Sequence, residues 1–121
     1  MAVLTSHTLN GFDGTHAGFI PVRLINLTNQ NCLFDTQMDA GGRLKETLDA
    51  RLLSPEARYE LVFETKDYWQ NQDLIRARLH IMDEIIFRFS MPDREGHYHI
   101  PIIINPNSYS VWWSGDQWLM A

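Results

Sequence analysis

The segment Gly-His-Tyr-His-Ile-Pro-Ile-Ile-Ile, residues 96–104, constrains the fold more than any other part of the chain. Side chains of a β-strand alternate between its two faces, so the segment predicts a strand with one apolar row: Tyr98, Ile100, Ile102 and Ile104. His97 and His99 then fall on the opposite face, with Cα atoms about 7 Å apart. Two groups that change charge near neutral pH at a fixed spacing suit proton transfer or metal binding. The alternative is a solvated strand face whose histidines have no chemical role.

Length and charge narrow the class of protein. A chain of 121 residues is large enough for one core, and we expect a single domain over residues 1–121. The net charge is −5 with scattered Lys and Arg residues, which argues against nucleic acid or an anionic membrane surface as a partner. We find no signal-peptide pattern, and no apolar run approaches the roughly 18 residues that span a bilayer. The sequence therefore predicts a cytoplasmic protein without a membrane segment.

Cys32 is the only cysteine of the chain. A single cysteine excludes an internal disulfide framework and a metal site built from several thiolates, and it fits a reducing compartment. Because Cys32 lies in a segment that reads as a strand, we expect it to be a small buried hydrophobic residue rather than a nucleophile.

The rest of the chain predicts an all-β domain. Short alternating segments bounded by turn residues indicate strands at residues 3–9, 19–27, 32–38, 57–63, one or two within 75–90, 98–104 and 108–113. Residues 65–72 are the best helix candidate, with Thr65 as its N-cap. Pro21 suggests an edge position or a bulge near the start of its strand. Seven to eight short strands and one short helix indicate an antiparallel β-sandwich.

Six motifs follow one another along the chain. They are Ser6-His7-Thr8-Leu9, Ile20-Pro21-Val22-Arg23-Leu24, Gly42-Arg43, Phe63-Glu64-Thr65-Lys66-Asp67-Tyr68-Trp69, His97-Tyr98-His99-Ile100-Pro101, and Asn105-Pro106 with Tyr109-Ser110. Each motif alone is weakly specific. Their order and spacing, from about residue 4 to residue 109, resemble the transthyretin-related family and, within it, the 5-hydroxyisourate hydrolases.

This resemblance implies a transthyretin-like antiparallel β-sandwich that assembles as a homotetramer, a dimer of dimers, in which two subunits form a channel. It implies a small-molecule substrate, 5-hydroxyisourate, an intermediate of urate breakdown whose ring is opened by water. The matching positions make His7, His97 and His99 the catalytic residues and Arg43 a substrate-binding residue. No cofactor is implied, although the same three histidines are able to pick up zinc.

The residue types themselves suit this chemistry. Hydrolysis of a cyclic acyl–nitrogen bond needs a base for water, a cation or donor for the oxyanion, and an acid for the leaving nitrogen. We expect one of His97 and His99 to activate water and His7 to orient or relay. The forked guanidinium of Arg43 is expected to bind the oxygen-rich ring in two places.

The C-terminal part departs from the family pattern. Known hydrolases of this family end in Tyr-Arg-Gly-Ser, whereas the aligned positions read Trp112-Trp113-Ser114-Gly115, and residues 116–121 follow. Two indoles replace a phenol and a guanidinium, which adds apolar area and removes positive charge. We predict that Trp112 and Trp113 line the channel, and that Ser110 and Ser114 lie near it as hydrogen-bond donors to the substrate.

Three alternatives stay open at this level. The first is a three-histidine metal site, because His-x-His on a strand also begins metal sites in other β-proteins. The second is a non-catalytic small-molecule-binding protein of the transthyretin type, with Trp112, Trp113 and Trp118 in an apolar channel. The third is a divergent transthyretin-like hydrolase or cyclase that acts on a bulkier, less polar ring. Fold alone does not choose among them.

Several polar residues lie outside this set of predicted roles. His16 stands where the family usually has proline, and we expect His16 and His80 to be surface or interface residues without a direct role. The sequence around Ser110 and Ser114 lacks a nucleophile elbow, which argues against a serine-hydrolase mechanism.

Overall fold

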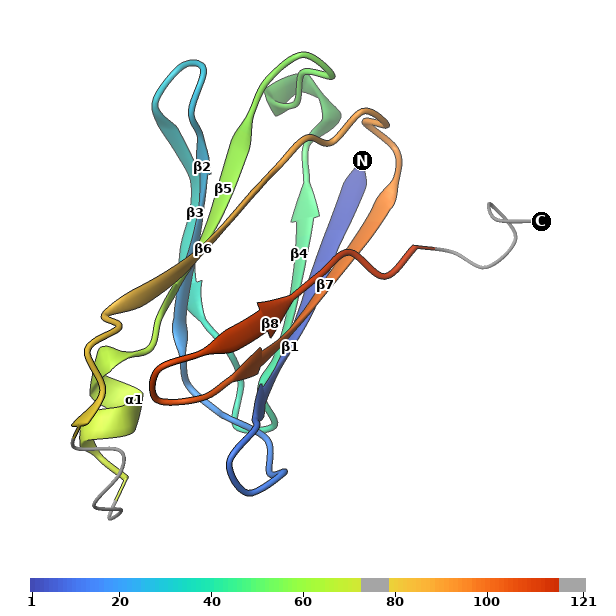
Figure 1. Cartoon of the computed structure of the whole chain (residues 1–121). Helices are drawn as coiled ribbons and strands as arrows, with labels where there is room; N and C mark the ends of the chain where they lie inside the picture. Colours follow the sequence, from blue (N-terminus) through green and yellow to red (C-terminus); the bar gives the residue numbers. More distant parts are fainter. Residues whose placement is uncertain (73–78, 116–121) are drawn as a thin grey trace.

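The computed structural model of the chain describes residues 1–72 and 79–115. Within these residues, eight strands form two four-stranded sheets that stack as two layers (Figure 1). The first sheet, in the order β4-β1-β7-β8, consists of Arg43–Leu48, Ala2–Asn10, His97–Ile104 and Tyr109–Val111. The second sheet, in the order β3-β2-β5-β6, consists of Asn31–Gln37, Pro21–Asn26, Tyr59–Glu64 and Glu84–Phe89. The predicted β-sandwich is therefore confirmed.

The centre of the first sheet holds one parallel pair. β1 and β7 run in the same direction, which places Thr5 opposite His99 and His7 opposite Pro101. The other neighbouring strands pair antiparallel, as the sequence predicts. Most of the chain separates β1 from β7, so no tight turn dictates their relative direction. The structure thus adds a parallel pair to the expected antiparallel arrangement.

Alternation along the strands fills the space between the sheets. The apolar row of β7 is buried as predicted, and the second sheet contributes Tyr59, Leu61 and Phe63, each with none of its surface exposed. Burial of a large apolar side chain contributes about 1.5–3 kcal/mol, so these facing rows supply much of the driving force for folding. On the opposite face of β7, His97 is exposed, His99 is half-buried and Pro101 is buried.

Two helical segments lie between strands. The 3₁₀ helix η1, Ala50–Leu52, follows β4, and the α-helix α1, Lys66–Gln70, follows β5 and buries Trp69. Thr65 occupies the predicted N-cap position but has helical backbone angles, and its buried hydroxyl makes no capping bond. An N-cap side chain reaches the first-turn amides from an extended backbone, so this conformation removes the expected cap. Neither helix in the described part of the chain is long enough to cross a membrane.

The last strand is shorter than predicted. The sequence indicates a strand at residues 108–113, whereas β8 ends at Val111. Pro101 of β7 lies where the ladder would continue, and proline has no N–H to donate. The amide of Trp112 still donates to the carbonyl oxygen of Pro101 at 3.3 Å, but the exchange of bonds that would extend β8 is lost. In the 75–90 region the strand is β6 alone, and residues 73–78 lie outside the described residues.

Two expectations about single residues are wrong. Pro21 is the first residue of β2, and β2 lies inside its sheet between β3 and β5 rather than at an edge, while the bulge that was the other expectation lies farther along, between Leu24 and Ile25. The pairing of β2 with β5 begins one residue later, at Val22, so the missing N–H of Pro21 costs that ladder nothing. Cys32 is exposed rather than buried, because it stands just after a turn on the edge strand β3.

A tight turn sets the start of β4. The Asp39 carboxylate accepts hydrogen bonds from the backbone N–H groups of Gly41 at 2.9 Å and Arg43 at 2.8 Å. Gly42 has φ +74°, and a Cβ atom added there would lie 2.6 Å from the carbonyl oxygen of Thr8. Only glycine meets both conditions without strain. This turn therefore fixes where the backbone of Arg43 joins the sheet.

We predict that Gly42→Ala destabilises the fold more than Gly14→Ala. Gly14 also has a positive φ, +79°, but nothing lies within 4 Å of an added Cβ, so it isolates the conformational cost. That cost is about 1–2 kcal/mol. Gly42→Ala adds the clash with Thr8, expected to cost about 1 kcal/mol more. Denaturant unfolding measures both, and equal losses would contradict this account of the turn.

Candidate functional site

The outer face of the first sheet gathers the predicted catalytic side chains from three strands. His7 of β1 lies opposite Arg43 of β4 on one side and opposite Pro101 of β7 on the other. His99 of β7 lies opposite Thr5, two residues before His7 on the same face of β1. His97 follows on the same face of β7. The structure thus places these four predicted residues on one face.

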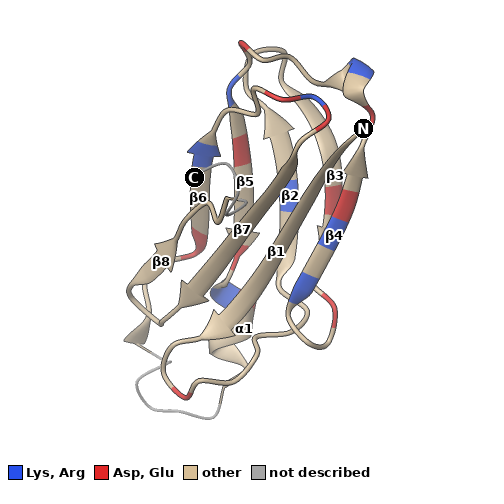
Figure 2. Cartoon of the chain, turned by 90° about the vertical axis from the view of Figure 1, so that its right-hand side faces the viewer, with Lys and Arg blue, Asp and Glu red and all other residues tan. Residues whose placement is uncertain are grey.

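Positive charge on this face comes from β4. β1, β7 and β8 contain no Lys, Arg, Asp or Glu, whereas β4 carries Arg43 and Lys45 on its exposed positions (Figure 2). The histidines therefore lie beside an edge of fixed positive charge. An anionic group on this face would meet Arg43 first, because Arg43 is the cation in register with His7.

Thr5 connects the two histidines of β7. Its hydroxyl lies 3.0 Å from Nε2 of His97 and 2.8 Å from Nδ1 of His99. A hydroxyl has one proton to donate, so one ring accepts from Thr5 and the other donates to it. The two rings consequently present different nitrogens, in different protonation states, to whatever binds on this face.

The surroundings of His99 indicate which ring donates. Burial, then the charges of His97 and Arg43, lower the pKa of His99 below the ordinary 6.5. A hydrogen bond to the Thr5 backbone opposes this lowering, as expected when a ring N–H donates to a carbonyl oxygen. We assign the proton of the neutral His99 ring to Nδ1, the nitrogen that lies 2.8 Å from the Thr5 hydroxyl, which leaves the lone pair on Nε2. A neutral imidazole with one exposed lone pair is a general base.

His7 is held by a second histidine. Nε2 of His7 lies 2.7 Å from Nδ1 of His16, and the two rings stack with centroids 4.8 Å apart. Burial, then Arg43 and His16, lower the pKa of His7, while a backbone hydrogen bond with Gly41 acts in the opposite direction. His16 is exposed, as predicted for a surface residue, but its contact with His7 was missed. The one sequence signal for this contact was the turn-rich stretch at residues 10–14, after which the chain runs back beside β1.

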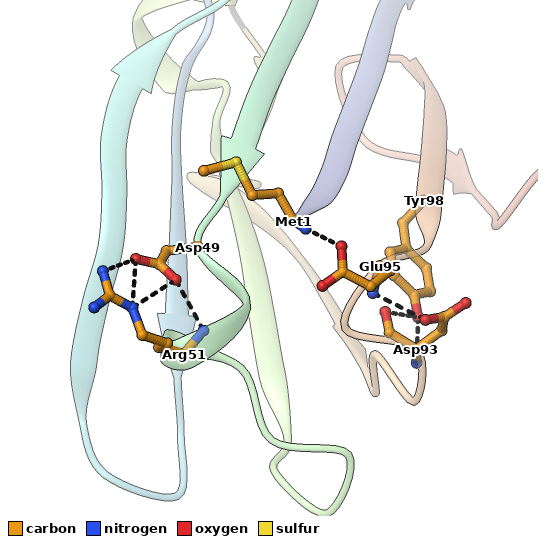
Figure 3. Close-up of polar contacts among 6 residues, drawn as sticks. All are labelled: Met1, Asp49, Arg51, Asp93, Glu95 and Tyr98. Atoms are coloured by element: carbon orange, nitrogen blue, oxygen red, sulfur yellow. Dashed lines mark hydrogen bonds and ion pairs between the residues drawn. The ribbon is translucent and has the colours of Figure 1, made fainter.

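The loop before β7 is tied down where the strand begins. The Tyr98 hydroxyl accepts from the backbone N–H of Asp93 at 2.8 Å and donates to the Asp93 carbonyl at 3.0 Å (Figure 3). The carboxylate of Asp93 accepts from the N–H of Glu95, and Glu95 pairs with the amino group of Met1. These contacts fix the backbone that enters His97.

The C-terminal predicted residues divide between two places. The Ser114 amide donates to the His99 carbonyl at 2.9 Å, and Ser110 pairs with Ile103 on the exposed face of β8. Trp112 follows β8 beside Pro101 and is 41% exposed. Trp113 instead lines a cavity on the other side of β7. Ser114 and Trp112 thus accompany the histidine face, and Trp113 does not.

That cavity lies between β6 and the start of β7, with a volume of about 670 Å³. Its walls are mostly apolar and include Phe87, Phe89, Tyr98, Ile100 and Trp113. Of the predicted catalytic residues only His97 reaches it, and His7, Arg43 and His99 are not among its lining residues. The cavity therefore adjoins the histidine face only at His97. Trp118 and the rest of residues 116–121 lie outside the described residues.

The predicted zinc ligands do not fit a metal ion in this arrangement. In the described ranges, no group of three or more His, Cys, Asp or Glu side chains is placed to hold one. Thr5 occupies one nitrogen each of His97 and His99, and His16 occupies Nε2 of His7. The backbone of Gly41 also holds His7. The misfit thus lies in the placement of the side chains, because the second ring nitrogens of His97 and His99 are not engaged by these contacts.

Comparison with known proteins agrees with this fold. A sequence model of the HIUase/Transthyretin family matches residues 4–113, and the chain belongs to this family. A 5-hydroxyisourate hydrolase of Deinococcus radiodurans is 30% identical over 111 residues, covering 90% of this chain and 92% of that protein. The fold is similar to that of Klebsiella pneumoniae 5-hydroxyisourate hydrolase, with a TM-score of 0.76, 24% identity, and coverage of 95% and 100% of the two chains. Sea bream transthyretin, solved in complex with thyroxine, has a TM-score of 0.76 at 23% identity, with 94% and 96% covered.

We predict that Arg43→Gln raises the pKa of both His7 and His99. The positive charge of Arg43 lowers both values, so its removal makes protonation of either ring easier. Lys45→Gln is the matched control, because it removes a cation from the same strand that does not contribute to either shift. NMR titration of the histidine rings measures these values. Unchanged or lower pKa values in Arg43→Gln would contradict the charge arrangement.

Proposed function

We propose that this chain is a 5-hydroxyisourate hydrolase, which opens the ring of its small-molecule substrate with water. The observation that carries the proposal is the His99 ring, whose Nδ1 lies 2.8 Å from the Thr5 hydroxyl and whose pKa is lowered by burial and then by the charges of His97 and Arg43. A D. radiodurans relative that carries this name matches 90% of the chain, which supports the same conclusion.

The base in this mechanism is Nε2 of His99. It takes a proton from a water molecule as the water oxygen adds to the ring carbonyl. Thr5 holds Nδ1 and so keeps the ring in the tautomer that is able to accept this proton. The lowered pKa of His99 keeps the ring neutral near pH 7, where a base is needed.

Hydrolysis also needs a donor for the oxyanion and an acid for the leaving nitrogen, and Arg43 and His7 serve these two requirements. The Arg43 guanidinium binds anionic oxygens of the substrate and stabilises the oxyanion that forms when water adds. The carbon–nitrogen bond then breaks, and the leaving nitrogen takes up a proton that is relayed from the side of His7. His7 is suited to this position because it lies in register with Arg43.

The proposal includes an assembly. We propose a cytoplasmic homotetramer, a dimer of dimers, in which the histidine faces of two subunits form one channel. In a single chain this face is the exposed side of a sheet, with His97 and Arg43 open to solvent. A second face laid against it would exclude water around the reacting atoms and strengthen the charge interactions there.

A second candidate is a hydrolase or cyclase of the same family that acts on a bulkier, less polar ring. Trp112 favours it, because this half-exposed indole lies beside Pro101, the residue in register with His7. Whether the substrate is 5-hydroxyisourate or a bulkier ring, we propose that it contacts Trp112, Ser110 and Ser114. The indole of Trp112 then determines which of the two rings is preferred. Slow turnover of 5-hydroxyisourate together with a gain in Trp112→Tyr would favour this candidate.

We predict that His99→Asn lowers kcat for 5-hydroxyisourate by 10²–10⁴-fold, the usual contribution of a general base. Asparagine keeps a donor near the position of Nδ1 but has no basic nitrogen. His97→Asn is expected to lose less, because its Nε2 accepts from Thr5 and is not the base. Arg43→Gln should lower kcat/KM on the order of 10²-fold, and Lys45→Gln should match the wild type. Ultraviolet decay of freshly made substrate measures all four, and undiminished rates in His99→Asn and Arg43→Gln would refute the mechanism.

We also predict that hydrolysis needs no metal. Among the described residues, no group of three or more His, Cys, Asp or Glu side chains is placed to hold an ion. Treatment of tag-free protein with a chelator should therefore leave kcat unchanged. A loss of activity that added zinc restores would show that the histidines rearrange around a metal ion.

A further inference from the structure

The loop after β1 brings His16 onto the face where His7 lies. His16 forms a bridge with Leu9, and the neighbouring backbone is fixed to β1 on both sides. The Asn10 amide donates to the Thr15 carbonyl at 2.8 Å, and the Ala17 amide donates to the Thr8 carbonyl at 3.0 Å. Because Ala17 is fully buried, the position of His16 is set by the fold rather than by its own exposed side chain.

The His7 ring lies between His16 and the backbone of Gly41. Nε2 lies 2.7 Å from Nδ1 of His16, and the backbone of Gly41 accepts from the ring, which acts to raise its pKa. If Nδ1 of His7 donates to Gly41, then its Nε2 accepts, and the proton between the rings belongs to Nδ1 of His16. Nε2 of the exposed His16 is then the nitrogen of the pair that is left to meet solvent or substrate.

We propose that His7 and His16 act as one acid–base unit, and that Nε2 of His16 is the nitrogen that delivers the proton to the leaving group. This inference rests on the proposed hydrolase function and identifies the acid of that reaction. It makes His16 a catalytic residue and His7 the residue that fixes its tautomer.

The proton balance is simple. In its acid form the pair carries one extra proton, on Nε2 of His16, with Nδ1–H donating to Nε2 of His7. Nε2 gives its proton to the leaving nitrogen as the carbon–nitrogen bond breaks, and the pair becomes neutral. His99 holds the proton taken from water and releases it to solvent, and the pair recovers a proton from solvent for the next cycle.

Charge explains why His16 rather than His7 carries the extra proton. His7 faces Arg43 from β4 and His99 from β7, and both disfavour a positive charge on its ring. His16 is the exposed ring of the pair and contacts His7 through Nδ1. The carboxylate of Asp13, in the same loop, accepts hydrogen bonds from the amide and the hydroxyl of Thr15.

The test separates delivery of a proton from simple support of His7. The amide nitrogen of an asparagine at position 16 occupies nearly the place of Nδ1, so His16→Asn keeps a donor toward His7 but has no Nε2 to titrate. We expect His16→Asn and His16→Ala to lower kcat for 5-hydroxyisourate on the order of 10²-fold and to lose the alkaline limb of the pH–kcat profile. Added imidazole should restore turnover in His16→Ala, while Lys66→Gln, on helix α1, behaves as wild type.

The outcomes distinguish this inference from the function it rests on. If the wild type turns over the substrate and His16→Asn keeps the same kcat and the same alkaline limb, the role of His16 is overturned. The proposed hydrolase function would then still stand. Absence of turnover in the wild type would overturn the proposed function and this role with it. If His16→Asn melts at a lower temperature than the wild type, imidazole rescue of His16→Ala distinguishes loss of proton delivery from loss of structure. A purely structural loss is not restored by a free base.

Discussion

The parallel contact between β1 and β7 is the interaction on which the rest of this structure depends. It joins the first strand to the last but one and sets their register, so that Thr5 lies opposite His99. The same register points the inner row of each strand into the core and the outer row toward solvent. A shift of one residue would exchange these rows, burying the imidazoles and exposing isoleucines, so hydrophobic burial protects the site geometry.

Arg43 gives the histidine face its electrostatic character. It is placed by the turn at residues 39–42, where the Asp39 carboxylate and the left-handed Gly42 hold the backbone. Its charge lowers the pKa of both His7 and His99, after the larger effect of burial, and so favours neutral rings near pH 7. In the mechanism we propose, this one cation serves two purposes, because it binds the anionic substrate and disfavours protonation of the neighbouring imidazoles.

Each histidine on this face is held by a different kind of partner. Thr5 bonds to His97 and His99, so a single hydroxyl proton makes their two rings unequal. His7 contacts His16, a ring contributed by a loop. The C-terminal residues also divide, since Trp112 accompanies this face whereas Trp113 lines the apolar cavity beside β6. The aromatic pair that replaces the family's Tyr-Arg is therefore not one functional unit in this chain.

The sequence alone determined the strand alternation, the sandwich and the residues that gather on one face, because apolar side chains recur at every second position and the family motifs keep their order. It did not determine the parallel direction of β1 and β7, the exposure of Cys32 or the early end of β8 at Pro101. The sequence also did not predict the contact between His7 and His16. These features arise where segments distant in sequence meet, and only the packed backbone specifies which groups then lie within hydrogen-bonding distance.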